Sequence, residues 1–82
     1  MRKVTVTVTL KPTLLDAQGR TVESALHSIG FDEANSVRIG KIIELQVPDE
    51  VSEAEIQSRV AAMCDKLLAN PVTEDYKIEV AA

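Results

Sequence analysis

Residues Lys3–Leu10 read KVTVTVTL, and this alternation of apolar and hydroxyl side chains is the clearest structural signal in the chain. Successive side chains of an extended strand point to opposite faces, so the valines and Leu10 share one face and the threonines the other. β-branched residues at a period of two are typical of a strand with one buried face. Proline has no N–H to donate to a neighbouring strand, so Lys11-Pro12 ends this strand.

The segment after this strand predicts a helix over residues 21–29. Its apolar residues recur at the spacing of one helical face: Val22, Ala25, Leu26 and Ile29. Thr21 is a suitable N-cap, and Asp16 is an alternative that caps an earlier first turn. Gly30 is expected to end the helix, because glycine readily takes the left-handed conformation that follows many helices.

Residues 37–47 read VRIGKIIELQV, and their apolar side chains fall on odd-numbered positions. A two-residue hairpin turn at Gly40-Lys41 would put the apolar sets of its two arms on opposite faces, which the register rule disfavours. The pattern therefore predicts one long strand, bent or bulged at Gly40. Eleven residues at about 3.3 Å each span roughly 36 Å, whereas a compact chain of this length is about 30 Å across. Either this strand bends into two, or its end pairs with a neighbouring chain.

The last part of the chain predicts a second helix and a closing strand. Ser52 and Glu55 form a capping box, and Asn70-Pro71 ends the helix. The expected buried face of this helix is Ile56, Val60, Met63 and Leu67, with Ala61, Cys64 and Leu68 beside it. Tyr76, Ile78 and Val80 then alternate with charged residues, as in a strand.

This order of elements predicts a two-layer α+β sandwich in one domain, residues 1–82, with an antiparallel sheet and both helices on one face. The long bent strand 37–47 is expected at the centre. If it splits in two, the order becomes the ferredoxin-like βαββαβ.

Composition excludes several classes of protein. The 82 residues have a formal charge of −4 and one tyrosine, one phenylalanine and no tryptophan, so the basic and aromatic surface of nucleic-acid modules is not expected. No apolar run approaches the length of a membrane span or a signal-peptide core. A single cysteine forms no internal disulfide, which favours a reducing cytoplasm. A chain this short has little stability margin, so a partner surface would stabilise it.

The residues that most often carry chemistry are sparse. His27 lies off its helix's apolar face and is interpreted as a solvated residue, and Cys64 is interpreted as a small core residue. Two such residues do not make a closed zinc site. Asp49-Glu50 and Glu74-Asp75 are interpreted as solvated acidic turns. Gly40-Lys41 has two interpretations: a strand bend with a solvated lysine, or a contact with an anion or with another subunit. It is not a phosphate-binding loop, because that motif needs several glycines before the lysine.

Three runs together resemble a known family: VTLKPTLLDAQGRTVESALHSIGF, VRIGKIIELQV and LLANPVTEDYKIEV. They are similar to the PurS family, the small subunits of phosphoribosylformylglycinamidine synthase, over residues 3–80. The chain departs at Thr13-Leu14, where the family often has a glycine after the proline.

The resemblance implies a subunit without an active site, which brings the large synthetase subunit PurL and the glutaminase PurQ together. It also implies a cytoplasmic homodimer or tetramer that binds no cofactor itself, within a complex that uses ATP and Mg. The residues that match the family's motifs are expected at subunit interfaces, with fold maintenance as the competing role. They are Lys11, Asp16, Gly19, Arg38, Gly40, Lys41, Asn70, Glu74 and Tyr76. The alternatives are a ferredoxin-like regulatory dimer that binds a small molecule, and a stand-alone enzyme, which the lack of paired reactive groups disfavours.

Overall fold

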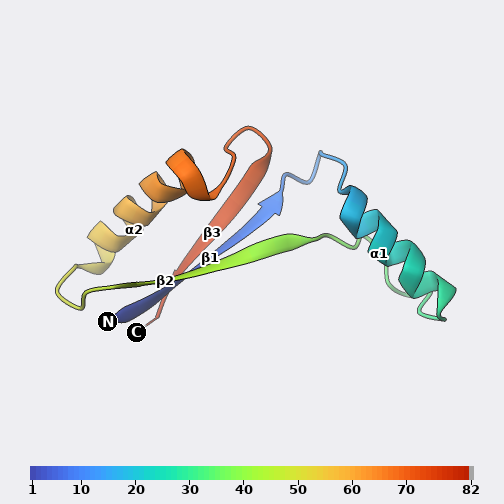
Figure 1. Ribbon diagram of the computed structural model, residues 1–82, viewed down its shortest axis with the longest axis horizontal. Coiled ribbons are helices and arrows are strands. Elements are labelled where there is room, and N and C mark those ends of the chain that lie inside the picture. Colours follow the sequence, from blue (N-terminus) through green and yellow to red (C-terminus); the bar gives the residue numbers. More distant parts are fainter. Residues whose placement is uncertain (82) are drawn as a thin grey trace.

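The computed structural model describes residues 1–81, which form three strands and two helices (Figure 1). The elements in chain order are β1 (Arg2–Leu10), α1 (Ala17–Ser28), β2 (Gly40–Val47), α2 (Glu53–Met63), the π-helical turn η1 (Cys64–Leu68) and β3 (Glu74–Val80). The strands form one antiparallel sheet in the order β2-β1-β3. The predicted α+β class and antiparallel sheet are confirmed.

The alternation in β1 sets the two faces of the sheet. Val6 lies opposite Ile43 of β2 and Ile78 of β3, and the same pairing of apolar residues repeats at Val4. The valines of β1 are almost completely buried, whereas its threonines are half-buried on the other face. One face of the sheet is therefore apolar along all three strands.

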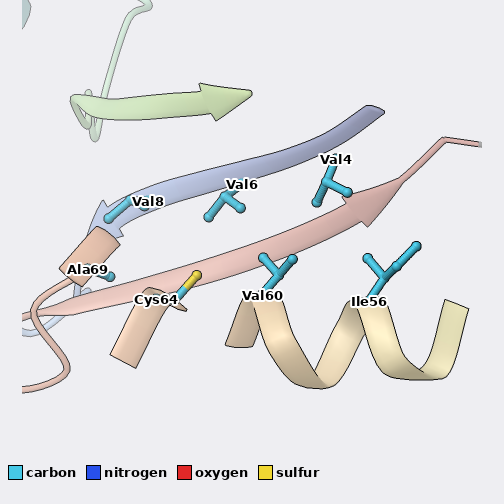
Figure 2. Close-up of a cluster of buried hydrophobic side chains, with 7 residues drawn as sticks. All are labelled: Val4, Val6, Val8, Ile56, Val60, Cys64 and Ala69. Carbon is cyan, nitrogen blue, oxygen red and sulfur yellow. The ribbon is translucent and has the colours of Figure 1, made fainter. Parts of the chain in front are cut away.

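Helix α2 covers this apolar face. Figure 2 shows Ile56, Val60 and Cys64 pointing from the helix toward the valines of β1, and all three are at most 1% exposed. Ser52 caps the helix by accepting a hydrogen bond from the Glu55 N–H at 3.2 Å, as the capping box predicts. The core of the molecule is this contact between one helix and one sheet face.

The buried face of α2 differs from the predicted one near its end. Met63 is 39% exposed and Leu67 is 84% exposed, although both were expected in the core. The wider turn η1 begins at Cys64, where the Ala69 N–H donates to the Cys64 carbonyl five residues earlier at 3.0 Å. One extra residue in the turn breaks the 3.6-residue period, so Cys64 stays in the core and Leu67 rotates into solvent.

Helix α1 lies beyond the end of the sheet and packs on neither of its faces (Figure 1). The prediction that two helices cover one face is therefore wrong, since α2 alone does so. The molecule measures 50 × 26 × 14 Å, with a radius of gyration of 16.1 Å, against about 12 Å for a compact chain of this length. Both termini lie at the opposite end of the sheet from α1 (Figure 1).

The second predicted strand, residues 37–47, is shorter than expected and lies at an edge of the sheet. It begins at Gly40, residues 37–39 are irregular, and β1 takes the central place. The segment is one strand, so the four-stranded ferredoxin-like order does not form. The reason is a pair of long-range contacts: the N–H of Val37 donates to the Glu23 carboxylate and that of Ile39 to the Asp16 carboxylate. Backbone donors bound to side chains cannot join a strand ladder.

The two ends of α1 show which predicted caps are used. Asp16 is the N-cap, so the helix starts one turn earlier than residues 21–29. Gly30 ends it as predicted, with a φ of +103°. The Phe31 N–H donates to the Leu26 carbonyl at 2.9 Å and the Gly30 N–H to the His27 carbonyl at 3.2 Å, which is the Schellman arrangement.

Candidate subunit interface

The two most reactive side chains of the chain lie apart. Cys64 is buried beneath the sheet, and burial, with a smaller effect from the charge of Asp65, raises the pKa of its thiol. His27 is on α1, half-buried rather than solvated as interpreted, and its Nε2 donates to the Ala34 carbonyl at 2.7 Å. In residues 1–81 no three histidine, cysteine or acidic side chains gather as a metal site, and no helix is long and apolar enough to span a membrane.

Asp16 joins the start of α1 to the start of β2. One carboxylate oxygen accepts from the Gly19 N–H at 2.8 Å and the other from the Ile39 N–H at 2.7 Å. These bonds, Ile39's foremost, lower the pKa of the Asp16 carboxyl although the side chain is buried. A Cβ at Gly19 would lie 2.2 Å from the Val37 carbonyl oxygen, so only glycine fits. Asp16 and Gly19 maintain the fold.

Arg38 closes the same junction from the other side. Its guanidinium donates to the carbonyls of Lys11 at 3.0 Å, Leu14 at 3.2 Å and Leu10 at 3.4 Å. The planar fork of arginine suits several acceptors at once. Arg38 therefore holds the loop between β1 and α1, which gives it a role within the chain.

A second group of motif residues surrounds the turn before β3. Glu74 accepts from the Asn70 N–H at 2.7 Å, and the Asn70 side chain accepts from the Val72 N–H at 3.0 Å. Lys11 pairs with Asp75 at 2.9 Å. Glu74-Asp75 is thus the start of a strand with bonded carboxylates, which corrects the interpretation as a solvated turn.

Tyr76 bonds to the turn that follows α2. Its hydroxyl donates to the Asp65 carboxylate at 3.3 Å. Burial, followed by the nearby Asp65 charge, raises the pKa of the Tyr76 hydroxyl. This bond connects β3 to η1, so Tyr76 too has a structural role.

Gly40 and Lys41 differ in what they contact. A Cβ at Gly40 would lie 2.4 Å from the Val8 carbonyl oxygen, so the glycine allows the close approach of β1 and β2. Within residues 1–81, Lys41 forms no ion pair and lines a hollow of about 290 Å³ at the end of the sheet nearest α1. Of the predicted interface residues that carry a polar side chain, Lys41 is the one whose side chain forms neither a hydrogen bond nor an ion pair within the described residues.

The strongest interface feature is the apolar face of α1, which sequence reasoning assigned to the core. We call Val22, Ala25, Leu26 and Ile29 the α1 stripe. Val22 is 38% exposed and Ile29 is 69% exposed, and Phe31 just after the helix is 49% exposed. A hollow of about 380 Å³ beside the stripe is lined by Val22 and Ile39. The sequence shows the apolar period of α1, but it does not show that the helix lies beyond the end of the sheet, where no strand covers this face.

Comparison with known proteins identifies relatives over nearly the whole chain. Residues 3–82 match the profile of the family described as PurS, phosphoribosylformylglycinamidine (FGAM) synthase. The PurS subunit of phosphoribosylformylglycinamidine synthase from Bacillus subtilis is 50% identical over 80 residues, 98% of this chain and 93% of that protein.

Solved structures agree with the sequence match. The structure of Methanocaldococcus jannaschii PurS, one of the subunits of formylglycinamide ribonucleotide amidotransferase, superposes with a TM-score of 0.88 at 40% identity, covering 99% of this chain and 96% of that one. A chain in the structure of PurLQS from Thermotoga maritima gives a TM-score of 0.87 at 29% identity, covering 98% of this chain and 96% of that one.

Proposed function

The chain belongs to the PurS family, the PurS subunits of FGAM synthase in purine biosynthesis, and from this premise we propose that it acts by binding other subunits and not by catalysis. Its partners in this proposal are the synthetase subunit PurL, the glutaminase subunit PurQ and further copies of itself. The occurrence of a similar chain in PurLQS from Thermotoga maritima supports the first two partners.

The exposed α1 stripe is the observation that carries the proposal. An amphipathic helix is stabilised by burying its apolar face, but α1 packs on no other helix or strand of the described chain, and of its stripe only Leu26 is half-buried. An exposed apolar face of this kind marks an interaction site in a folded protein. Because the polar motif residues other than Lys41 already bond within the chain, we infer that the molecule offers its partners mainly shape and apolar surface.

A second copy of the chain is the partner we assign to the α1 stripe. Helix α1 projects from the sheet along the 50 Å axis of the molecule, so a symmetric partner reaches it without disturbing the core. Contact between the two stripes is self-complementary, as a two-fold interface requires. The outer edges of β2 and β3 are unpaired within residues 1–81.

The chemistry of the synthase then belongs to the other subunits. In this proposal ATP and Mg bind outside the present chain, and the complex works in the cytoplasm.

Reconstitution from purified subunits tests the proposed function. PurL and PurQ are assayed for glutamine-dependent formation of the amidine product with and without this chain, and for ammonia-dependent formation in parallel. We expect the glutamine-dependent rate to require the chain, while the ammonia-dependent rate of PurL persists without it. Full glutamine-dependent activity without this chain would contradict the proposal, as would turnover of the substrate by this chain alone.

A further inference from the structure

A second exposed surface lies on the flank of α2, away from the α1 stripe. We define the α2 groove by Ser58, Arg59, Ala62, Met63 and Lys66, which line an open hollow of about 320 Å³. Arg59, Met63 and Lys66 follow one another at steps of four and three residues, so they form one row on the helix. The core side chains Ile56 and Val60 point instead toward the sheet (Figure 2).

Two exposed apolar side chains belong to this part of the molecule. Met63, which lines the groove, is 39% exposed, and Leu67, which follows Lys66 in η1 and does not line the hollow, is 84% exposed. The π-helical turn is the cause, because its extra residue moves Leu67 out of the core-facing row. Burial of so exposed a leucine against a partner lowers the free energy of the complex, because apolar surface is removed from water.

The rim of this surface is positively charged on a chain of net charge −4. Within residues 1–81, neither Arg59 nor Lys66 forms an ion pair, although Glu55 lies one helical turn before Arg59. By contrast, Lys3 and Lys11 are paired with carboxylates. Two free cations beside an exposed methionine and leucine have the composition of an interface core, where methionine and arginine are enriched.

We propose that the α2 groove docks a heterologous subunit of the complex, through a segment with apolar side chains flanked by carboxylates. The inference rests on the proposed function and deepens it by assigning the surface. A second copy of this chain is the poorer occupant, because a two-fold contact would place Arg59 and Lys66 of both copies against each other. Like charges facing each other across an interface oppose binding.

Charge reversal in the groove tests the assignment. In R59E/K66E both cations become carboxylates, and R20E/K77E makes the same change in net charge at sites outside the groove. Binding of each protein to purified PurL and to purified PurQ is measured by surface plasmon resonance, with self-association followed by sedimentation velocity. We expect R59E/K66E to bind one of the two subunits about tenfold or more weakly than wild type. The control and the self-association should match wild type.

A variant with no change in charge tests the exposed leucine that follows Lys66. It also provides a result if the charge-reversed protein fails to fold. Leu67→Ser changes an exposed side chain, and we expect it to weaken the same binding step with unchanged melting temperature. If both variants bind PurL and PurQ with wild-type affinity, the inference is overturned. The proposed function still stands in that case, because the wild-type chain binds its partner subunits. An equal loss in R20E/K77E, or altered self-association in R59E/K66E, also overturns it. Failure of wild type to bind either subunit overturns the proposed function itself.

Discussion

The carboxylate of Asp16 accepts a hydrogen bond from the backbone N–H of Ile39 at 2.7 Å, across 23 residues of sequence. The same side chain caps α1 through Gly19. One residue thus determines where the helix starts and keeps residues 37–39 out of the strand. Because α1 has no strand beneath it, this bond and the Arg38 contacts hold the helix at its place beyond the sheet.

The Asp16 bonds predict an acid-dependent loosening of the α1 junction. Its folded-state pKa lies below the ordinary 3.8, so its stabilising effect is complete above that pH and is lost as pH falls through the folded-state value. We expect the Ile39 amide to exchange slowly with deuterium near pH 5 and to lose protection below about pH 4. In Asp16→Asn the protection should be weaker and independent of pH in this range. Equal pH dependence in both proteins would contradict the role of Asp16.

Gly19 is predicted to tolerate no side chain. In Gly19→Ala the new Cβ would lie 2.2 Å from the Val37 carbonyl oxygen, so α1 and residues 37–39 must separate. We expect loss of amide protection throughout α1, measured by hydrogen exchange, with the core of α2 and β1 still protected. Gly30→Ala is the control: its φ of +103° is strained for alanine, but the space is open, so it should fray only the end of α1. Normal protection of α1 in Gly19→Ala would refute the close approach.

Arg38→Lys is expected to loosen the loop between β1 and α1. An ammonium group cannot reproduce the three carbonyl contacts of the guanidinium fork. Loss of even one such hydrogen bond raises the fraction of molecules in which this loop is detached about fivefold. Limited proteolysis should therefore cut residues 11–16 faster by at least that factor. Arg20→Lys is the control, because the Arg20 side chain forms no hydrogen bond or ion pair in residues 1–81, and this variant should be cut like wild type. Equal cleavage of the two variants would argue against the Arg38 contacts.

The Cys64 thiol is predicted to be unreactive in the folded protein. It is fully buried and its pKa is raised, so both access and thiolate formation are suppressed. We expect labelling by a disulfide reagent at pH 8 to run about a hundredfold slower than in the denatured chain and to follow the unfolding rate. Rapid labelling of the native protein would instead reveal an accessible nucleophile and reopen the case for catalysis.

The α1 stripe is predicted to control self-association. Ile29→Asp places a charge on the stripe, whereas Ile42→Asp places one on the uncovered face of the sheet, and the two isoleucines are 69% and 66% exposed. We expect Ile29→Asp to weaken the dimer about tenfold or more in sedimentation equilibrium, with Ile42→Asp close to wild type. The reverse order of effects would move the interface from α1 to the sheet face.

The motif residues were expected at interfaces, with fold maintenance as the competing role, and most of them form bonds within the chain. Asp16, Gly19 and Arg38 build the α1 junction, and Asn70 with Glu74 builds the turn before β3. Sequence patterns of this kind mark positions with strict requirements but do not distinguish an internal contact from an external one. The apolar stripe of α1, whose exposure depends on the absence of a strand beneath it, is the surface to which we assign a partner.

The sequence by itself determined the elements that depend on near neighbours. The alternation of β1 defined a buried valine face, Ser52 and Glu55 started α2, and Gly30 ended α1, because each of these signals acts within a few residues. The interpretation of Cys64 as a core residue is confirmed as well. Only the structure decided where α1 lies, where β2 begins, and that Leu67 is exposed. The first two outcomes depend on contacts such as Asp16 with Ile39, between residues far apart in the chain, and the third depends on the π-helical turn η1, which interrupts the helical period.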